Sequence, residues 1–156
     1  MVAFERNLTV FEACCLPNNH QFEAYDFSDF EYGERIVRTT DGQNFALLTM
    51  EDKTVPEVGN LLAAIYEDRL DEMERARRFN EIFGAVCDPL EDKELDTGIR
   101  IICPICGSSS VTYRQSKPIR TKHFLIPVIT HEAWSRRAPE DKRALIEETL
   151  RSKGLL

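Results

Sequence analysis

Cys103-Pro104-Ile105-Cys106-Gly107 is the stretch of this chain that most constrains its fold. Two cysteines separated by two residues, with Gly after the pair, are typical of a tight turn at the tip of a β-hairpin. Both thiolates can then reach one tetrahedral Zn²⁺. Gly107 supplies a permissive backbone that lets the amides after the turn approach the sulfur atoms. The stretch therefore predicts half of a metal site, and a complete site needs two further ligands.

The second half of this site has to come from isolated residues, because the chain contains no second Cys-x-x-Cys pair. Cys15 and His20 are the preferred completion, since thiolate and imidazole are donors that zinc selects. Cys14 is able to replace Cys15. Three further donor residues are held in reserve: Cys87, His123 and His131. The predicted site is thus Cys15, His20, Cys103 and Cys106 around a structural zinc. The alternative is a metal-free hairpin with buried thiols.

A second turn in the chain has a similar context. Cys15-Leu16-Pro17-Asn18 is followed by Tyr25, ten positions after Cys15, and Tyr113 follows Cys103 at the same offset. Both turns lie between β-rich segments. The pair resembles the two knuckles of a zinc ribbon, with Asn18 standing where a cysteine is expected in the first. The resemblance covers about a quarter of the chain. It implies that the N-terminal and C-terminal sheets pack together across the helical middle.

The first half of the chain predicts antiparallel strands followed by a long helical segment. The β-rich segments are 8–15, 22–27, 35–40 and 44–49. Asp41-Gly42, between the last two segments, is a strong hairpin signal. Thr54 as N-cap and Glu57 at N3 match a capping box, and apolar residues at helical spacing continue to residue 83. A break near 67–71 is consistent with this length, and Gly84 is suited to end the helix.

The second half predicts a linker, a hairpin and a closing helix. Residues 88–98 are acidic and contain Pro and Gly, so the boundary between two lobes is placed there. Strands are expected at 99–102, 111–114 and 124–130, and a helix at 139–153. The fold is therefore predicted to be α+β, with an acidic lobe over 1–87 and a basic, knuckle-bearing lobe over 99–156. The two lobes are expected to pack as one domain.

Charge is divided unevenly along the chain. Residues 1–98 hold 22 acidic and 9 basic side chains, a net charge of −13. Residues 99–156 hold 5 acidic and 11 basic side chains, a net charge of +6. Such asymmetry can hold two lobes together or present an acidic surface to a basic partner. It argues against general nucleic-acid binding by the whole chain, since phosphate contacts need a basic footprint.

Composition predicts a soluble protein of the cytosol. No apolar run approaches the roughly 18 residues that a membrane span needs. The first residues lack the basic and apolar regions of a secretory signal. Five cysteines, two of them adjacent, make a poor disulfide framework and favour reduced thiols.

The segment 22–34 suggests a protein-binding face. It carries five acidic and five aromatic side chains and no basic one. Aromatic rings supply rigid contact area, and carboxylates attract Arg and Lys of a partner. The candidate partner-binding residues are Glu23, Tyr25, Asp26, Asp29, Phe30, Glu31 and Tyr32. The alternative is an ordinary amphipathic strand, with aromatics in the core and acids in water.

These features favour a non-enzymatic binding or inhibitor protein. Size, acidity and the lack of catalytic motifs look like small bacterial immunity proteins, which implies a basic toxin or nuclease as partner. One alternative is a zinc-ribbon-like adaptor that contacts nucleic acid or a larger assembly through Arg114, Lys117, Arg120 and Lys122.

A third class is an enzyme that uses His131 as a base and a cysteine as nucleophile. Two observations argue against catalysis. No phosphate-binding glycine motif is present, and the residues after Cys106 read as turn and strand, not as the helix of a redox motif. We expect His131 instead to cap or pack at a strand-to-helix junction beside Trp134.

Overall fold

The computed structural model describes residues 2–27 and 33–156 and has the predicted α+β fold. It consists of two compact units, each built from two separate stretches of chain. Met1–Thr49 and Ile99–Val128 form the first, here called the sheet unit. Met50–Gly98 and Ile129–Leu156 form the second, here called the helical unit. These units differ from the linear lobes 1–87 and 99–156, because both of them use residues from each half of the sequence.

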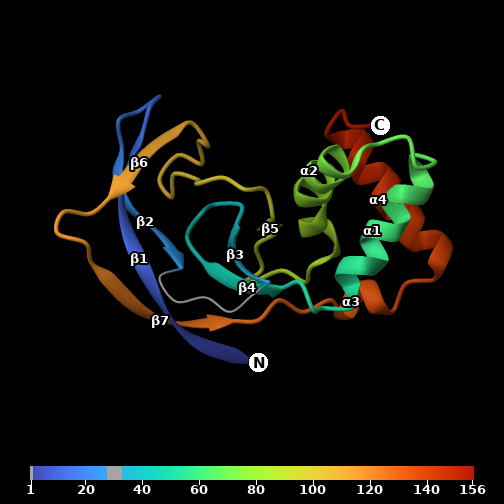
Figure 1. The fold of residues 1–156 in the computed structure, drawn as a ribbon, viewed down its shortest axis with the longest axis horizontal. Helices are drawn as coiled ribbons and strands as arrows, with labels where there is room; N and C mark the ends of the chain where they lie inside the picture. Colours follow the sequence, from blue (N-terminus) through green and yellow to red (C-terminus); the bar gives the residue numbers. More distant parts are fainter. Residues whose placement is uncertain (1, 28–32) are drawn as a thin grey trace. The chain divides into compact units, whose positions relative to one another are not determined.

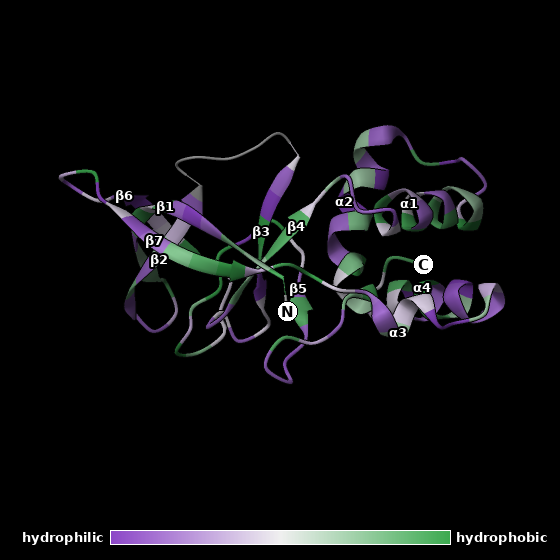
Figure 2. Cartoon of the chain, turned by 90° about the horizontal axis from the view of Figure 1, so that it is seen from below, coloured by the Kyte–Doolittle hydropathy of each residue, from purple (hydrophilic) through white to green (hydrophobic). Residues whose placement is uncertain are grey.

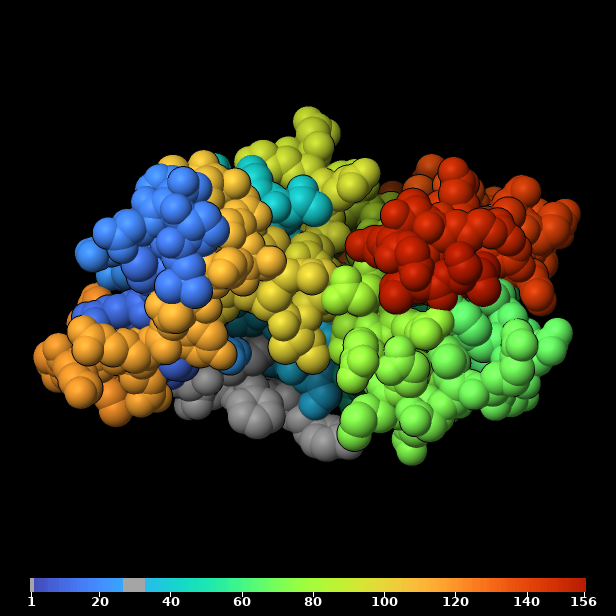
Figure 3. Space-filling view, turned by 90° about the horizontal axis from the view of Figure 1, so that it is seen from above, coloured from blue at the N-terminus to red at the C-terminus, as the bar shows by residue number. Residues whose placement is uncertain are grey.

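The division changes the distribution of charge. The sheet unit has 8 acidic and 8 basic residues, so its formal charge is zero. The helical unit has 19 acidic and 12 basic residues and carries the whole net charge of −7. The acidic start of the chain and its basic later part therefore meet in one unit. Figure 3 shows atoms of the N-terminal strands (blue) against atoms of the segment 99–128 (gold and orange).

The sheet unit is organised around its first strand, β1 (Ala3–Cys15). Along one edge β1 pairs antiparallel with β2 (Gln21–Phe27). Along its other edge it pairs first with β7 (Thr121–Pro127) and then with β6 (Val111–Gln115), as Figure 1 shows. The register places Cys15 opposite Val111. This pairing brings the end of β1 next to the segment that follows the predicted knuckle.

The sheet unit also contains β3 (Glu34–Thr39) and β4 (Phe45–Thr49), which pair as an antiparallel hairpin. The Asp41-Gly42 turn between them is confirmed. Asp41 Oδ1 accepts hydrogen bonds from the Thr39 hydroxyl at 2.6 Å and from the Gln43 amide at 3.1 Å. Gly42 has φ +73°, and a Cβ there would lie 2.9 Å from the carbonyl oxygen of Ile102. Glycine is needed at this position for both reasons.

The core of the sheet unit joins strands from both stretches of chain. Its buried centre consists of Leu8, Ile36, Leu47 and Ile126. Tyr25, Phe45 and Phe124 pack around it edge to face, with the Tyr25 and Phe124 ring centroids 4.9 Å apart. Apolar burial of this kind, about 25 cal/mol per Å², is the main force that closes the unit.

The helical unit contains α1 (Thr54–Ile65), α2 (Glu72–Ile82) and α4 (Pro139–Ser152), which contact one another. Shorter elements are a 3₁₀ turn, η1 (Phe83–Val86), a two-residue strand, β5 (Leu95–Asp96), and α3 (Glu132–Ser135). Figure 2 shows hydrophobic and hydrophilic segments alternating along the three longer helices, as expected when one face is buried.

The predicted break in the helical middle is confirmed, and its caps are different from those expected. Glu67 and Asp68 adopt positive φ between the helices, and Asp71 caps α2 by accepting a hydrogen bond from the Glu74 amide at 2.7 Å. The prediction that Thr54 is an N-cap is wrong, because Thr54 is already helical. Asp52 accepts from its amide at 2.9 Å instead.

Three further expectations are corrected by the structure. Gly84 does not end a helix but lies inside η1. The predicted strand 99–102 has no regular secondary structure. The strand expected at 124–130 begins and ends three residues earlier, at Thr121–Pro127, so it includes Lys122, one of the predicted basic contact residues.

Glu57, expected in a capping box, instead joins α1 to the C-terminal helices. Its carboxylate accepts hydrogen bonds from Lys142 Nζ at 2.6 Å and from Trp134 Nε1 at 3.0 Å. Burial alone would raise the pKa of Glu57, but these two donors outweigh it and lower the pKa. Trp134 is fully buried and lies beneath the Lys142 ammonium. The single tryptophan is thus fixed by polar contacts at its edge and face.

Asp88 holds the start of α3. Its carboxylate accepts hydrogen bonds from the Thr130 hydroxyl at 2.6 Å and from the Glu132 and Ala133 amides at 2.7 and 3.1 Å. Burial alone would raise the pKa of Asp88, but these three donors lower the pKa below its ordinary value of 3.8. The stabilisation is therefore present above that pH and is lost as the pH falls through the lowered value.

We expect Asp88→Ala to reduce the free energy of unfolding of the helical unit at pH 7 by about 1–2 kcal/mol, the usual cost of removing a carboxylate cap. Urea denaturation followed by helical circular dichroism measures the difference. The gap between variant and wild type should shrink in strongly acidic buffer, where the wild-type carboxylate is also protonated. An equal gap at both pH values would contradict the assignment.

Within residues 2–27 and 33–156, no helix is long and apolar enough to cross a membrane.

Candidate metal centre

The first pair of donor residues lies at the turn between β1 and β2. Cys15 is the last residue of β1, and His20 directly precedes β2. The Cys15 amide donates to the His20 carbonyl at 2.9 Å, which closes the turn. The Leu16 amide donates to the Ser110 carbonyl at 2.9 Å, so the turn is also attached to the segment before β6.

The second pair lies in the turn Cys103–Gly107, here called the knuckle. The Gly107 amide donates to the Cys103 carbonyl at 2.8 Å, and the Cys103 amide donates to the Ser108 carbonyl at 2.8 Å. Gly107 has φ +75°, the left-handed conformation that glycine adopts at no steric cost. The tight turn predicted at Cys103–Gly107 is therefore present.

The four donor atoms converge. Those of Cys15, His20, Cys103 and Cys106 all lie within 4.8 Å of one another. Cys15 Sγ is 3.4 Å from Cys106 Sγ, and Cys103 Sγ is 3.6 Å from His20 Nδ1. Tetrahedral zinc with ordinary bond lengths requires about 3.8 Å between two sulfurs and about 3.6 Å between sulfur and nitrogen. The cluster therefore has the size and donor chemistry of a four-coordinate site.

The thiols of the cluster occupy different environments. Cys15 and Cys103 are 0% exposed, whereas Cys106 is exposed. Burial raises the pKa of the Cys15 thiol. Hydrogen bonds from the Asn18 side chain and then from the Ser108 backbone lower the pKa of Cys106 to about 6. A thiolate at Cys106 is the form that binds a metal ion.

Asn18 is the residue that sequence reasoning missed. It occupies the position where a second cysteine was expected. Its side chain contributes most to lowering the pKa of Cys106, and its backbone opposes the effect of burial on the pKa of Cys15. The signal for this role was present in the sequence, because Asn18 interrupts a turn that otherwise matches the knuckle.

For the zinc site predicted from the sequence, Asn18→Ala should weaken zinc affinity by about tenfold, a usual effect of removing a polar group that supports a metal ligand. Competition with a chromogenic chelator measures the affinity. Asn60→Ala, an exposed asparagine on α1, is the matched control and should leave it unchanged. Equal affinities of the two variants would contradict the proposed role of Asn18.

The other candidate ligands lie outside the cluster. Cys14 Sγ donates to Asn19 Oδ1 at 3.1 Å, so it does not replace Cys15. His123 Nδ1 is 3.0 Å from Asn7 Oδ1 on the β1–β7 pair. Cys87 and His131 belong to the helical unit. The structure describes all five cysteines, and none of them forms a disulfide.

The predicted partner-binding residues are described only in part, since Asp29, Phe30, Glu31 and Tyr32 lie outside the described residues. Glu23 and Asp26 are exposed on β2. The Tyr25 ring packs in the core, and its hydroxyl donates to Glu23 at 2.8 Å. Burial, followed by the interaction with Glu23, raises the pKa of Tyr25 to about 12.

The predicted basic contact residues lie close to these acids. Arg114 pairs with Glu12 at 3.0 Å, and Arg120 pairs with Glu23 at 3.2 Å. All four line one groove of about 680 Å³ over β1, β2 and β6. Lys122, further along, lies over the rings of Tyr25 and Phe124. The groove thus presents balanced charge.

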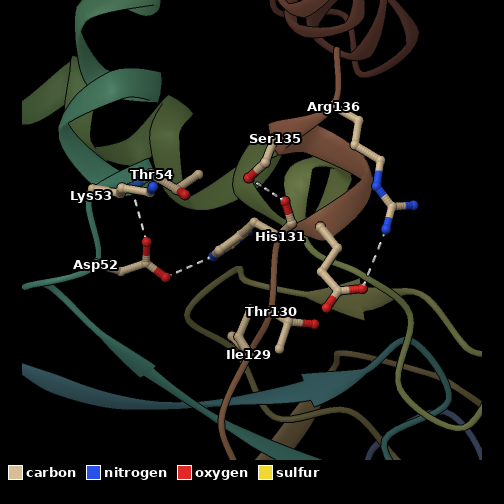
Figure 4. Close-up of a pocket in the computed structure, with 9 residues that line it drawn as sticks. Asp52, Lys53, Thr54, Ile129, Thr130, His131, Ser135 and Arg136 are labelled. Carbon is tan, nitrogen blue, oxygen red and sulfur yellow. Dashed lines mark hydrogen bonds and ion pairs between the residues drawn. The ribbon is translucent and has the colours of Figure 1, made fainter.

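His131 lies in the helical unit, in a pocket of about 410 Å³ shown in Figure 4. Its Nδ1 donates to the Val86 carbonyl at 2.8 Å, and its Nε2 is 3.0 Å from Asp52 Oδ2. The Ser135 hydroxyl in the same pocket donates to the backbone carbonyl of His131 at 2.8 Å, away from the ring. The imidazole therefore joins η1 to the start of α1.

Comparisons with protein-family models, with curated proteins and with solved structures find no match to this chain.

Proposed function

We propose that Cys15, His20, Cys103 and Cys106 bind one structural zinc ion. The observation that carries this proposal is the convergence of four soft or imidazole donors within 4.8 Å. Four protein ligands complete a tetrahedron and leave no position for water or substrate, which is the pattern of structural and not catalytic zinc. Bound there, zinc joins the end of β1 to the knuckle and so supports the pairing of β1 with β6.

Metal analysis of the purified protein tests this proposal. We expect one zinc per chain in wild-type protein by elemental analysis, and a clear loss in Cys103→Ser. Cys14→Ser is the matched control, because it removes the adjacent thiol that lies outside the cluster, and it should retain the metal. Wild-type protein that neither contains zinc nor binds it in titration would overturn the proposal.

We further propose that the protein acts by binding a basic protein and not by catalysis, as an immunity protein does with a toxin. Two observations support this role. The helical unit carries the net charge of −7, and exposed Glu23 and Asp26 lie on β2. A net negative surface accelerates encounter with a cationic partner and disfavours nucleic acid. The reduced thiols favour the cytosol as its compartment.

Affinity capture from native cells at low and high salt tests the binding role. We expect one basic protein to be retained at low salt and released at high salt. The double variant Glu23→Gln and Asp26→Asn should retain less of it. Glu148→Gln on α4 removes one exposed acid from the helical unit, and an equal loss of retention there would show that net charge, and not the β2 acids, carries the binding. Retention of nucleic acid instead would favour the adaptor alternative and contradict the inhibitor role.

A further inference from the structure

We infer that a hydroperoxide oxidises the metal cluster by joining Cys15 and Cys106 in a disulfide, which releases the metal ion. This inference rests on the proposed zinc site and adds its regulation. Among the three cluster thiols that the structure describes, Cys106 is the exposed one, and Cys15 and Cys103 are buried. An oxidant in solution therefore reaches Cys106 first.

The arrangement selects Cys15 as the partner of Cys106. The two sulfur atoms are 3.4 Å apart, close enough for one to attack the other after small movements. Cys103 Sγ instead lies beside His20 Nδ1, at 3.6 Å. Cys14 Sγ lies on the other side of the strand, donating to Asn19. Cys15 is thus the resolving thiol that the geometry provides.

Access to Cys106 is also built into the knuckle. Ile105, the residue before it, is 63% exposed. A Cβ built at Gly107, the residue after it, meets no atom within 4 Å. Open space on both sides of Cys106 lets a small peroxide approach its sulfur atom. The same openness leaves room for the turn to move when a covalent bond forms.

The chemistry proceeds in two balanced steps. The Cys106 thiolate attacks one oxygen of hydrogen peroxide, the O–O bond breaks, and the departing hydroxide takes a proton to form water. The sulfur is thereby oxidised to a sulfenic acid. The Cys15 thiolate then attacks that sulfur, the S–S bond forms, and hydroxide leaves and takes a second proton. Two thiolates, one peroxide and two protons yield one disulfide and two waters.

Loss of two thiolates removes two of the four donors. His20 and Cys103 remain, and two ligands do not hold zinc against competing buffers. The connection between the two stretches of the sheet unit nevertheless persists, because the new bond joins residues 91 positions apart. Oxidation thus exchanges a metal cross-link for a covalent one, and the protein releases zinc without losing the closure of β1 on the knuckle.

The test uses zinc-loaded Cys14→Ser protein, in which only one cysteine remains on the N-terminal peptide. Hydrogen peroxide is titrated in, and released zinc is followed with a chromogenic chelator. Non-reducing tryptic mapping, with fragmentation of the linked peptides to separate Cys103 from Cys106, then identifies the bond. We expect loss of one zinc per chain together with a cross-link between the peptides 7–35 and 101–114. The wild-type protein should release zinc over the same peroxide range.

Three results would overturn the inference. They are zinc that stays bound while Cys106 becomes oxidised, zinc release with the bond between Cys103 and Cys106 inside one peptide, and oxidation confined to Cys87. The same mapping on chelator-treated, reduced protein separates this inference from the proposed zinc site. If the protein never binds zinc but forms the Cys15–Cys106 bond, the proposed function fails and the thiol pairing stands.

Discussion

Cys103→Ser is expected to lower the melting temperature of the zinc-loaded protein by roughly 10–20 °C. The cost follows from losing a structural metal, which stabilises small zinc domains by about 10 kcal/mol or more, and we expect at least about 3 kcal/mol to be lost here. In a unit of this size each kcal/mol corresponds to about 4–8 °C. Cys103 is fully buried and touches His20, so serine leaves a weaker donor at the centre of the cluster.

Calorimetry with and without a strong chelator measures this effect. Chelator should lower the wild-type melting temperature to that of Cys103→Ser and leave the variant unchanged, since the variant has little metal to lose. Cys14→Ser should melt like wild type and respond to chelator in the same way. If chelator does not shift the wild-type transition, zinc does not stabilise the fold.

Gly84→Ala is expected to destabilise the helical unit by about 3 kcal/mol. A Cβ at Gly84 would overlap the carbonyl oxygen of Leu95, which is backbone and has no rotamer to change. The Gly84 backbone is also fixed, because its amide donates to Thr97 Oγ1 at 2.9 Å and that hydroxyl donates to Asn80 O at 2.7 Å. Relief of the overlap therefore breaks a buried hydrogen-bond chain.

Gly59→Ala is the matched control for this prediction. Gly59 lies in α1 of the same unit, and a Cβ there meets no atom within 4 Å. Alanine should raise the free energy of unfolding by about 0.5–1 kcal/mol, because it has the higher helix propensity. Urea denaturation measures the free energy of unfolding of both variants. If the contact at Gly84 causes the loss, this free energy falls in Gly84→Ala and rises in Gly59→Ala. If both variants lose stability, the helical unit tolerates alanine poorly at either glycine, and the contact with Leu95 does not explain the effect.

Elements governed by local chemistry were predictable from the sequence. The Asp41-Gly42 hairpin, the break between α1 and α2 and the knuckle depend on turn residues and on short-range hydrogen bonds. The four donor residues were also predictable as a group, because zinc accepts few side-chain types and the chain offers few of them.

Features that depend on distant partners were not predictable. Lys53 and not Thr54 is the N-cap position of α1, with the Thr54 amide donating to Asp52. Glu57 took Lys142 and Trp134 as partners, 85 and 77 positions away. The apolar segment 99–102 has strand composition, but the residues that follow it form the knuckle and no ladder continues it. Local propensity cannot anticipate which of several satisfactory partners lies nearest in the folded chain.

The charge division shows the same limit. Counted along the chain, the first 98 residues are strongly acidic and the rest are basic. In the structure, Arg114 lies against Glu12 and Arg120 lies against Glu23. The sheet unit, which contains strands from both halves of the chain, is neutral, and the helical unit carries the net charge. Counting charges along the sequence therefore assigns the acidic surface to the wrong part of the protein when strands from both halves share one sheet.

The central position of β1 has a consequence for synthesis on the ribosome. This strand emerges well before β6 and β7, which pair with one of its edges and begin 96 or more residues after its end. His20 likewise waits 83 residues for Cys103, roughly 4–17 s at ordinary translation rates of about 5–20 residues per second. During that interval the nascent strand exposes an unpaired edge and two unsatisfied metal donors. Slow and late closure of the sheet unit follows from this order of strands.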